Sequence, residues 1–161
     1  MFGGAAVLFL TRHAAAALKP TPGPGDAGTP LEIIGTVYCA DGQPAPGAHV
    51  ELWRADEAGY YDVSGDRFRT DLVLDGTATF TVKTVMPGHY PTGVRQHVHF
   101  LVRADGCKPL VTQMYFESDP DRNFTRDPLI RSRDRARSVT VSTEGGSPIA
   151  RAHVDLVLET L

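Results

Sequence analysis

The sequence predicts an all-β fold, an antiparallel β-sandwich built as one domain. Apolar and polar residues alternate in short runs, Asp-Gly turn signals separate several of these runs, and glycine (16) and proline (12) are spread along the 161 residues. This pattern is typical of short strands joined by turns and not of long helices. A chain of this length buries about 70% of the surface that its unfolded form exposes, so it needs no disulfide scaffold.

The individual strands are predicted from alternation and from β-branched composition. Val-Glu-Leu-Trp alternates within residues 49–54, and β-branched residues dominate 77–85. In the last strand, alternation places Val154, Leu156 and Leu158 on one face. The eight expected strands are residues 31–39, 49–54, 69–74, 77–85, 97–103, 110–116, 138–142 and 152–159.

Two segments fall outside this strand pattern. Residues 1–30 are expected to form an N-terminal arm or linker, helical through about residue 18 and then rich in Pro and Gly, which leaves 31–161 as the sandwich domain. Residues 119–137 are polar, with one short helix expected. The arginine-rich run at 131–137 is interpreted as a solvated face, with a phosphate or nucleic-acid patch as the alternative.

Composition narrows the classes of function. A net charge of −3 and a pI near 6.0 argue against nucleic acid as a partner. No run approaches the roughly 20 apolar residues of a membrane span, and the apolar residues 2–10 lack the basic flank of a signal peptide. Cys39 and Cys107 are interpreted as reduced thiols of a cytoplasmic protein, with one disulfide between strand ends as the alternative.

The motif with the clearest chemistry is His97-Val98-His99, because residues two apart in a strand point to the same side. Tyr61 and Tyr90 also fall at loops or strand starts that one end of a sandwich would bring near this pair. Two imidazoles and two phenolates form a hard donor set with two negative charges, which suits Fe(III) better than Zn(II) or Cu(I). These four residues are therefore predicted as metal ligands.

Two other interpretations of the histidine pair stand beside this one. A cupin-type site would place a glutamate shortly after the second histidine, and residues 100–105 contain none. A non-catalytic sandwich, similar to transthyretin-like or adhesin-like binding modules, would treat the tyrosines as core or turn residues. That alternative leaves the grouping of tyrosines and histidines unexplained.

A set of short motifs occurs along the chain: Gly59-Tyr60-Tyr61, Arg69-Thr70-Asp71, Phe80, Pro87-Gly88-His89-Tyr90, His97-Val98-His99-Phe100, Ala104-Asp105-Gly106 and Thr112-Gln113. In order and spacing, these motifs resemble the intradiol ring-cleavage dioxygenases, the family of catechol 1,2-, hydroxyquinol 1,2- and protocatechuate 3,4-dioxygenases. The resemblance covers residues 31–120 and is expected to continue to 158, without the arm. In size, the chain resembles the single-domain members.

The resemblance implies a non-haem Fe(III) centre with Tyr61 and His99 equatorial and Tyr90 and His97 axial. The implied substrates are a small aromatic diol and O2, with oxygen inserted between the two hydroxylated carbons to give a muconate-type diacid. Tyr90 would leave the metal when a catechol binds. A substituted or bulkier catechol is expected, with residues 53–59 and the arm setting its substituents, and a homo-oligomer is compatible with the family.

The resemblance also implies two further catalytic residues. Gln113 matches the family's glutamine on the next strand. The family's arginine stands three residues before the first histidine, whereas Arg95 stands two before His97, a shift that reverses the facing of a strand residue. A surface salt bridge is the alternative for Arg95.

Several other residues receive structural or open predictions. Tyr60 is expected to pack, His89 to be exposed in its turn, and Arg54 either to meet a substrate carboxylate or to be solvent-exposed. The remaining histidines are treated as structural: His13, His49 and His153.

Overall fold

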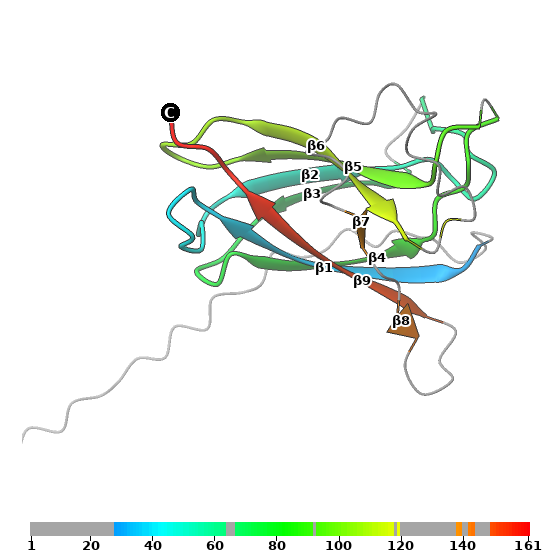
Figure 1. Ribbon diagram of the computed structural model, residues 1–161, viewed down its shortest axis with the longest axis horizontal. Helices are drawn as coiled ribbons and strands as arrows, with labels where there is room; N and C mark the ends of the chain where they lie inside the picture. Colours follow the sequence, from blue (N-terminus) through cyan, green and yellow to red (C-terminus); the bar gives the residue numbers. More distant parts are fainter. Residues whose placement is uncertain are drawn as a thin grey trace, which may run out of the picture.

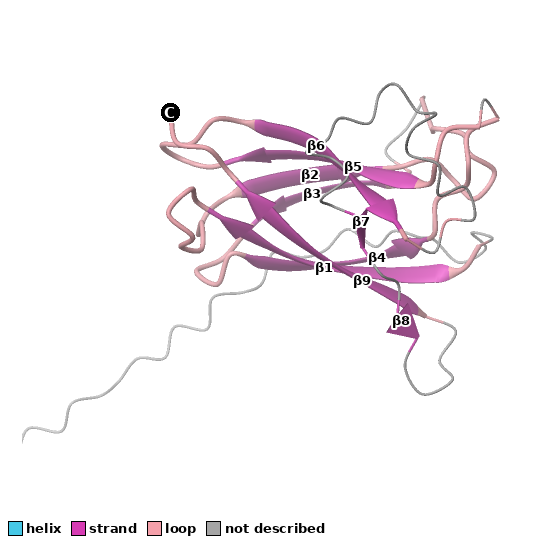
Figure 2. Cartoon of the chain, viewed as in Figure 1, coloured by secondary structure: helices cyan, strands magenta, loops and turns pink. Residues whose placement is uncertain are grey.

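The computed structural model describes residues 28–63, 67–91, 93–117, 119, 138–139, 142–143 and 149–161. These residues form strands and loops (Figure 2). They include no helix that is long and apolar enough to cross a membrane. The strands are β1 (Pro30–Tyr38), β2 (His49–Trp53), β3 (Arg69–Val73), β4 (Thr79–Val85), β5 (His97–Arg103), β6 (Leu110–Phe116), β7 (Ser138–Val139), β8 (Ser142–Thr143) and β9 (Ala150–Val157).

The strands pair into two sheets that face each other (Figure 1). One sheet has the order β4-β1-β9-β8 and the other β3-β2-β5-β6-β7. Most neighbours are antiparallel, while β1 with β9 and β6 with β7 are parallel. The predicted β-sandwich is confirmed, with these two parallel pairings added to the antiparallel pattern.

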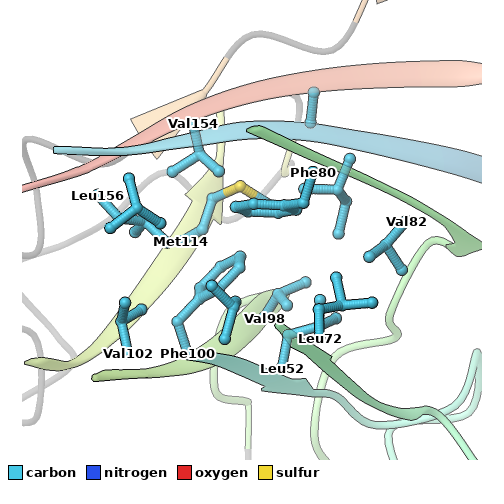
Figure 3. Close-up of a cluster of buried hydrophobic side chains, with 14 of the residues drawn as sticks. Leu52, Leu72, Phe80, Val82, Val98, Phe100, Val102, Met114, Val154 and Leu156 are labelled. Atoms are coloured by element: carbon cyan, nitrogen blue, oxygen red, sulfur yellow. The ribbon is translucent and has the colours of Figure 1, made fainter. Parts of the chain in front are cut away.

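The core lies between the sheets and consists of the inward-pointing residue of each alternating pair. Val98, Phe100 and Val102 of β5 are all 0% exposed, and Phe100 packs near Phe80 of the opposite sheet, ring centroids 6.3 Å apart (Figure 3). Alternation in the sequence thus places every second residue of β5 in the core. The residues between them, including His97 and His99, lie on the outer face of the five-stranded sheet.

The predictions for residues 138–142, 119–137 and 1–30 have different outcomes. The segment 138–142, expected as one strand, contributes β7 to one sheet and β8 to the other, so the single-strand prediction is wrong. Local composition at such short strands does not specify a partner sheet. The predicted helix through residue 18, the helix within 119–137 and the arginine-rich run lie outside the described residues, as does most of the predicted arm.

The loops that connect β2 to β3 and β4 to β5 lie at the same end of the sandwich (right side of Figure 1). They hold Tyr61 and Tyr90, and β5 begins with His97 at that end. The four predicted ligands therefore come from two loops and one strand.

Candidate metal centre

Direct backbone contact between the two loops brings their tyrosines together. The Gly88 amide donates a 2.8 Å hydrogen bond to the Asp56 carbonyl. A Cβ on Gly88 would lie 2.0 Å from the Glu57 carbonyl oxygen, and one on Gly59 only 1.9 Å from that of His89. Gly59 also has φ of +86°, which L side chains rarely adopt. Only glycine permits this approach at both positions.

The two histidines lie side by side on the outer face of β5, with fixed cross-strand neighbours. His99 is paired with Trp53 of β2 on one side and with Gln113 of β6 on the other, while His97 is paired with Tyr115. This register decides which side chains surround the imidazoles.

Four donor atoms converge from these elements. The Tyr61 hydroxyl lies 2.8 Å from His99 Nε2 and 3.5 Å from His97 Nε2, and the Tyr90 hydroxyl lies 2.8 Å from His97 Nε2. The two Nε2 atoms are 3.1 Å apart, and the two tyrosine hydroxyls contact each other. Two phenol oxygens and two imidazole nitrogens thus form one compact cluster.

Four of the donor pairs have the spacing that one metal ion requires. Metal bonds of about 2.1 Å at angles from 90° to tetrahedral separate two donors by about 3.0–3.4 Å, close to the 2.8–3.5 Å of these pairs. The two tyrosine hydroxyls lie closer together and would have to separate to bind the same ion. In the described part of the chain, no three His, Cys, Asp or Glu side chains gather as possible ligands. A metal here would therefore be held by tyrosine oxygens as well as by histidine nitrogens.

Burial shifts the titration of Tyr61 and His99 toward their neutral forms. Desolvation raises the pKa of Tyr61 to about 12. Desolvation, and secondarily the charge of His97, lowers the pKa of His99 to about 4. Neutral imidazoles are ready to bind a metal, while the phenols need the field of a multivalent cation to lose their protons near neutral pH.

Hydrogen bonds behind the imidazoles orient both rings. His97 Nδ1 lies 2.6 Å from the Arg95 carbonyl oxygen, to which it donates, so its Nε2 keeps the lone pair for the cluster. The Gln113 side-chain amide lies 3.2 Å from His99 Nδ1, and the Tyr115 hydroxyl donates to Gln113 Oε1. These contacts are of the kind that fixes metal-binding histidines.

Stacking adds a third constraint on His99. The Trp53 ring is parallel to the imidazole, with centroids 5.0 Å apart and an interplanar angle of 8°. The Arg69 guanidinium carbon lies 5.3 Å from the Trp53 ring centroid. The His99 ring is therefore held by stacking as well as by the Gln113 amide.

Arg95 is buried, unlike the surface residue that the alternative prediction expected. Its guanidinium is 2% exposed, donates from Nη2 to the Phe116 carbonyl at 3.0 Å and lies 3.6 Å from Asp119 Oδ2. The surface salt bridge is wrong, because Arg95 and Asp119 are both buried. Arg95 reaches the candidate centre through its backbone carbonyl, which holds His97.

Arg54 and Tyr60 lie in settings that differ from those predicted. Arg54 is 1% exposed, so the solvent-exposed alternative is wrong; its Nε donates to Thr84 Oγ1 at 2.7 Å and its guanidinium carbon lies 4.1 Å from the Phe68 ring centroid. Burial lowers the pKa of Arg54 to about 10, partly opposed by Asp56, which leaves it charged near neutral pH. Tyr60, expected to pack, is 60% exposed.

His89 was expected to be exposed in its turn. Its side chain is 32% exposed, and its Nε2 lies 2.9 Å from Oδ1 of the buried Asp119. His49 pairs with Asp71 at the surface, and His153 is exposed on β9. His13 lies outside the described residues.

Comparison with known proteins places this arrangement in a family. The family model described as Dioxygenase matches residues 8–160. Together with the relatives that follow, this match shows that the chain belongs to the intradiol ring-cleavage dioxygenases. The resemblance found in the sequence motifs is confirmed.

Two curated relatives are enzymes of this family. Chlorocatechol 1,2-dioxygenase of Pseudomonas sp. (strain P51) is 33% identical over 83% of this chain and 60% of the relative. Hydroxyquinol 1,2-dioxygenase of Nocardioides simplex is 33% identical over 83% of this chain and 56% of the relative. The chain therefore spans less than two thirds of the length of these relatives.

Solved structures agree on the fold. The dioxygenase domain of a dioxygenase carbohydrate-binding protein fusion from Streptomyces sp. SirexAA-E has a TM-score of 0.75 and 31% identity, covering 87% of this chain and 86% of that chain. Catechol 1,2-dioxygenase from Acinetobacter sp. ADP1, inhibited by bound mercury, has a TM-score of 0.72 and 26% identity, covering 87% of this chain and 55% of that chain.

The sequence did not reveal three features of the centre. Trp53 had a usable signal, since alternation places it on the outer face of β2 that β5 shares. The contact between the Gly59 and Gly88 loops and the role of Asp119 had none. They depend on partners far away in the chain.

Proposed function

We propose that this chain is a non-haem Fe(III) intradiol dioxygenase that opens the ring of a catechol-type substrate between its two hydroxylated carbons to give a muconate-type diacid. The observation that carries the proposal is the convergence of two phenol oxygens and two imidazole nitrogens within 2.8–3.5 Å at one end of the sandwich. A hard, doubly anionic donor set of this kind favours a ferric ion.

The ligands proposed for the ion are Tyr61, Tyr90, His97 and His99. Ferric iron, when bound, serves as a Lewis acid and template that makes a chelated catechol susceptible to attack by O2. Tyr61, His97 and His99 would hold the ion throughout. Tyr90 would give way to the incoming diol, and its phenolate oxygen would take up a proton from one catechol hydroxyl.

Gln113 and Arg95 complete the proposed machinery. Gln113 holds the His99 ring from behind, with its Nε2 3.2 Å from His99 Nδ1 while its Oε1 accepts a hydrogen bond from the Tyr115 hydroxyl. Arg95 places a positive charge next to the segment that holds His97, and its carbonyl fixes the tautomer of that ring. The charge of Arg95 is proposed to stabilise negative charge that develops on the substrate.

A substituted or bulkier catechol is the proposed substrate. A surface hollow of about 160 Å³ is lined by Asp56, Glu57, Ala58, Arg67 and Phe68. Three of these residues belong to the segment 53–59 that leads to Tyr61.

Colour is the direct test of the proposal. The iron-loaded protein should show visible tyrosinate-to-Fe(III) charge-transfer absorption, which Tyr61→Phe and Tyr90→Phe should each change. A panel of catechols should yield muconate-type products, with a substituted catechol turned over at least as fast as catechol itself. A colourless protein that keeps no iron after reconstitution would instead favour the non-catalytic binding module.

The partners and location complete the proposal. A small aromatic diol and O2 are the proposed substrates, with a homo-oligomer compatible with the family. A cytoplasmic location is proposed because Cys39 and Cys107 are both free thiols, their sulfurs 4.0 Å apart.

A further inference from the structure

Asp119 is a buried carboxylate at a position where the sequence predicted only a polar segment. It follows the end of β6 and is 0% exposed. Its backbone amide donates to the Phe116 carbonyl at 3.2 Å, which closes a turn after the strand. A buried carboxylate is costly unless its oxygens are bonded and its charge is balanced, so its partners indicate why it is there.

Both oxygens of Asp119 bind groups that adjoin proposed metal ligands. Oδ1 lies 2.9 Å from His89 Nε2, and His89 directly precedes Tyr90. Oδ2 accepts a 2.9 Å hydrogen bond from the Gln96 amide, and Gln96 directly precedes His97. One carboxylate therefore connects the two segments that present Tyr90 and His97.

Arg95 balances the charge of this carboxylate. Its Nε lies 3.6 Å from Asp119 Oδ2, and its Nη2 donates to the Phe116 carbonyl at the start of the same turn. The Arg95 carbonyl in turn accepts the hydrogen bond from His97 Nδ1. The ion pair is thus linked to the orientation of the imidazole through one residue.

The segment between the two ligands has little regular structure to hold it. It turns through a 2.8 Å hydrogen bond from the Gly93 amide to the Tyr90 carbonyl and a 3.2 Å bond from the Tyr90 amide to the Val94 carbonyl. Contacts to Asp119 at His89 and Gln96 fix the two ends of this loop to the turn that follows β6. The Tyr90 hydroxyl and His97 Nε2 lie 2.8 Å apart across the loop.

We propose that Asp119 is a positioning residue that sets the geometry of Tyr90 relative to His97, acting through His89 on one side and Gln96 on the other. The inference rests on the proposed function in one respect, namely that Tyr90 and His97 bind iron. The tether itself is a property of the iron-free chain.

The experiment uses His89, because replacing Asp119 would leave the Arg95 charge buried without its carboxylate and the variant could fail to fold. His89→Ala removes one arm of the tether and leaves the Arg95 and Asp119 pair in place. His49→Ala is the matched control, since His49 and His89 are 34% and 32% exposed and each pairs with an aspartate. His89→Gln restores a donor to Asp119 and should rescue the loss.

Three measurements are made on the 161-residue chain. Iron affinity, by competition with a chelator, should fall about 10- to 100-fold in His89→Ala, the usual effect of losing a group that orients a ligand. The charge-transfer band should shift. Hydrogen exchange in the iron-free protein should accelerate in the 89–97 segment. His49→Ala should change none of the three.

The outcomes separate the inference from the proposed function. A wild-type protein that is colourless and binds no iron overturns the proposed function, and hydrogen exchange still tests the tether. If the wild type is coloured while His89→Ala keeps its band, iron affinity and exchange rates, the tether is wrong. Equal losses in His49→Ala, or no rescue by His89→Gln, would also overturn it.

Discussion

The two faces of β5 differ in their surroundings and in their expected roles. One face packs in the core, and the other carries two of the proposed metal ligands. Val98 and Phe100 point inward and are 0% exposed among apolar neighbours, while His97 and His99 point outward into a cluster of polar and aromatic groups. The inner face has its partners in the opposite sheet. The outer face has them in two loops and in the neighbouring strands. The comparison teaches that a rigid core face can position the proposed metal ligands on the other face, because the same backbone carries both.

Replacing an inner-face residue should have the largest effect on stability. Phe100→Ala removes a fully buried ring that packs near Phe80, so the free energy of unfolding should fall by about 3–5 kcal/mol. Urea unfolding of the iron-free protein measures this loss. A loss below about 1 kcal/mol would mean that the inner face does not carry the stability.

The contact between the two loops should come next. Gly88→Ala places a Cβ 2.0 Å from the Glu57 carbonyl oxygen, which forces the loops apart. We expect a loss of about 1–3 kcal/mol together with weaker iron binding. Gly76→Ala is the control, because a Cβ there has nothing within 4 Å. Equal behaviour of the two variants in unfolding and iron titration would contradict the role given to this contact.

An outer-face ligand should affect function much more than stability. His99→Ala, one position before Phe100, should abolish the charge-transfer band and ring cleavage and change the stability of the iron-free protein by about 1 kcal/mol or less. Absorbance spectra and urea unfolding check the two halves of this prediction. Retention of the band with full intensity would remove His99 from the ligand set.

The last prediction concerns the pH dependence of stability. Burial lowers the pKa of His99 to about 4 in the fold, against about 6.5 in an unfolded chain. Between these values the unfolded chain binds more protons, so the free energy of unfolding of the iron-free protein should fall as pH drops from about 6.5 to about 4.

The variant used above isolates this contribution. His99→Ala should lose stability less steeply than the wild type over the same pH range, because its other titrating groups are unchanged. Unfolding curves measured at several pH values in the presence of a chelator make the comparison. Parallel pH profiles of the two proteins would contradict the lowered pKa.

Strand positions were the most predictable part of this molecule. The strands expected at residues 97–103 and 110–116 match β5 (His97–Arg103) and β6 (Leu110–Phe116) to the residue. Alternation is a local property of the sequence, so it predicts a strand regardless of what that strand packs against. The position of His97 and His99 on the same face of β5 follows from the same local rule.

Predictions failed where a residue's setting depends on distant partners. Arg54 is buried because Thr84 and Phe68 come from other elements to receive its guanidinium. Tyr60 is exposed because its neighbour Tyr61 takes the inward position in the loop. Neither outcome is encoded in the few residues around these positions.

The sequence by itself determined the family, the sandwich and the four residues predicted to bind iron, since strand periodicity and motif spacing are read along the chain. Tertiary structure alone decided that the loops of Gly59 and Gly88 touch, that Trp53 stacks on His99, and that Asp119 joins the segments of Tyr90 and His97. Periodicity specifies which side chains share a face. Which faces and loop ends meet is a result of long-range pairing and packing.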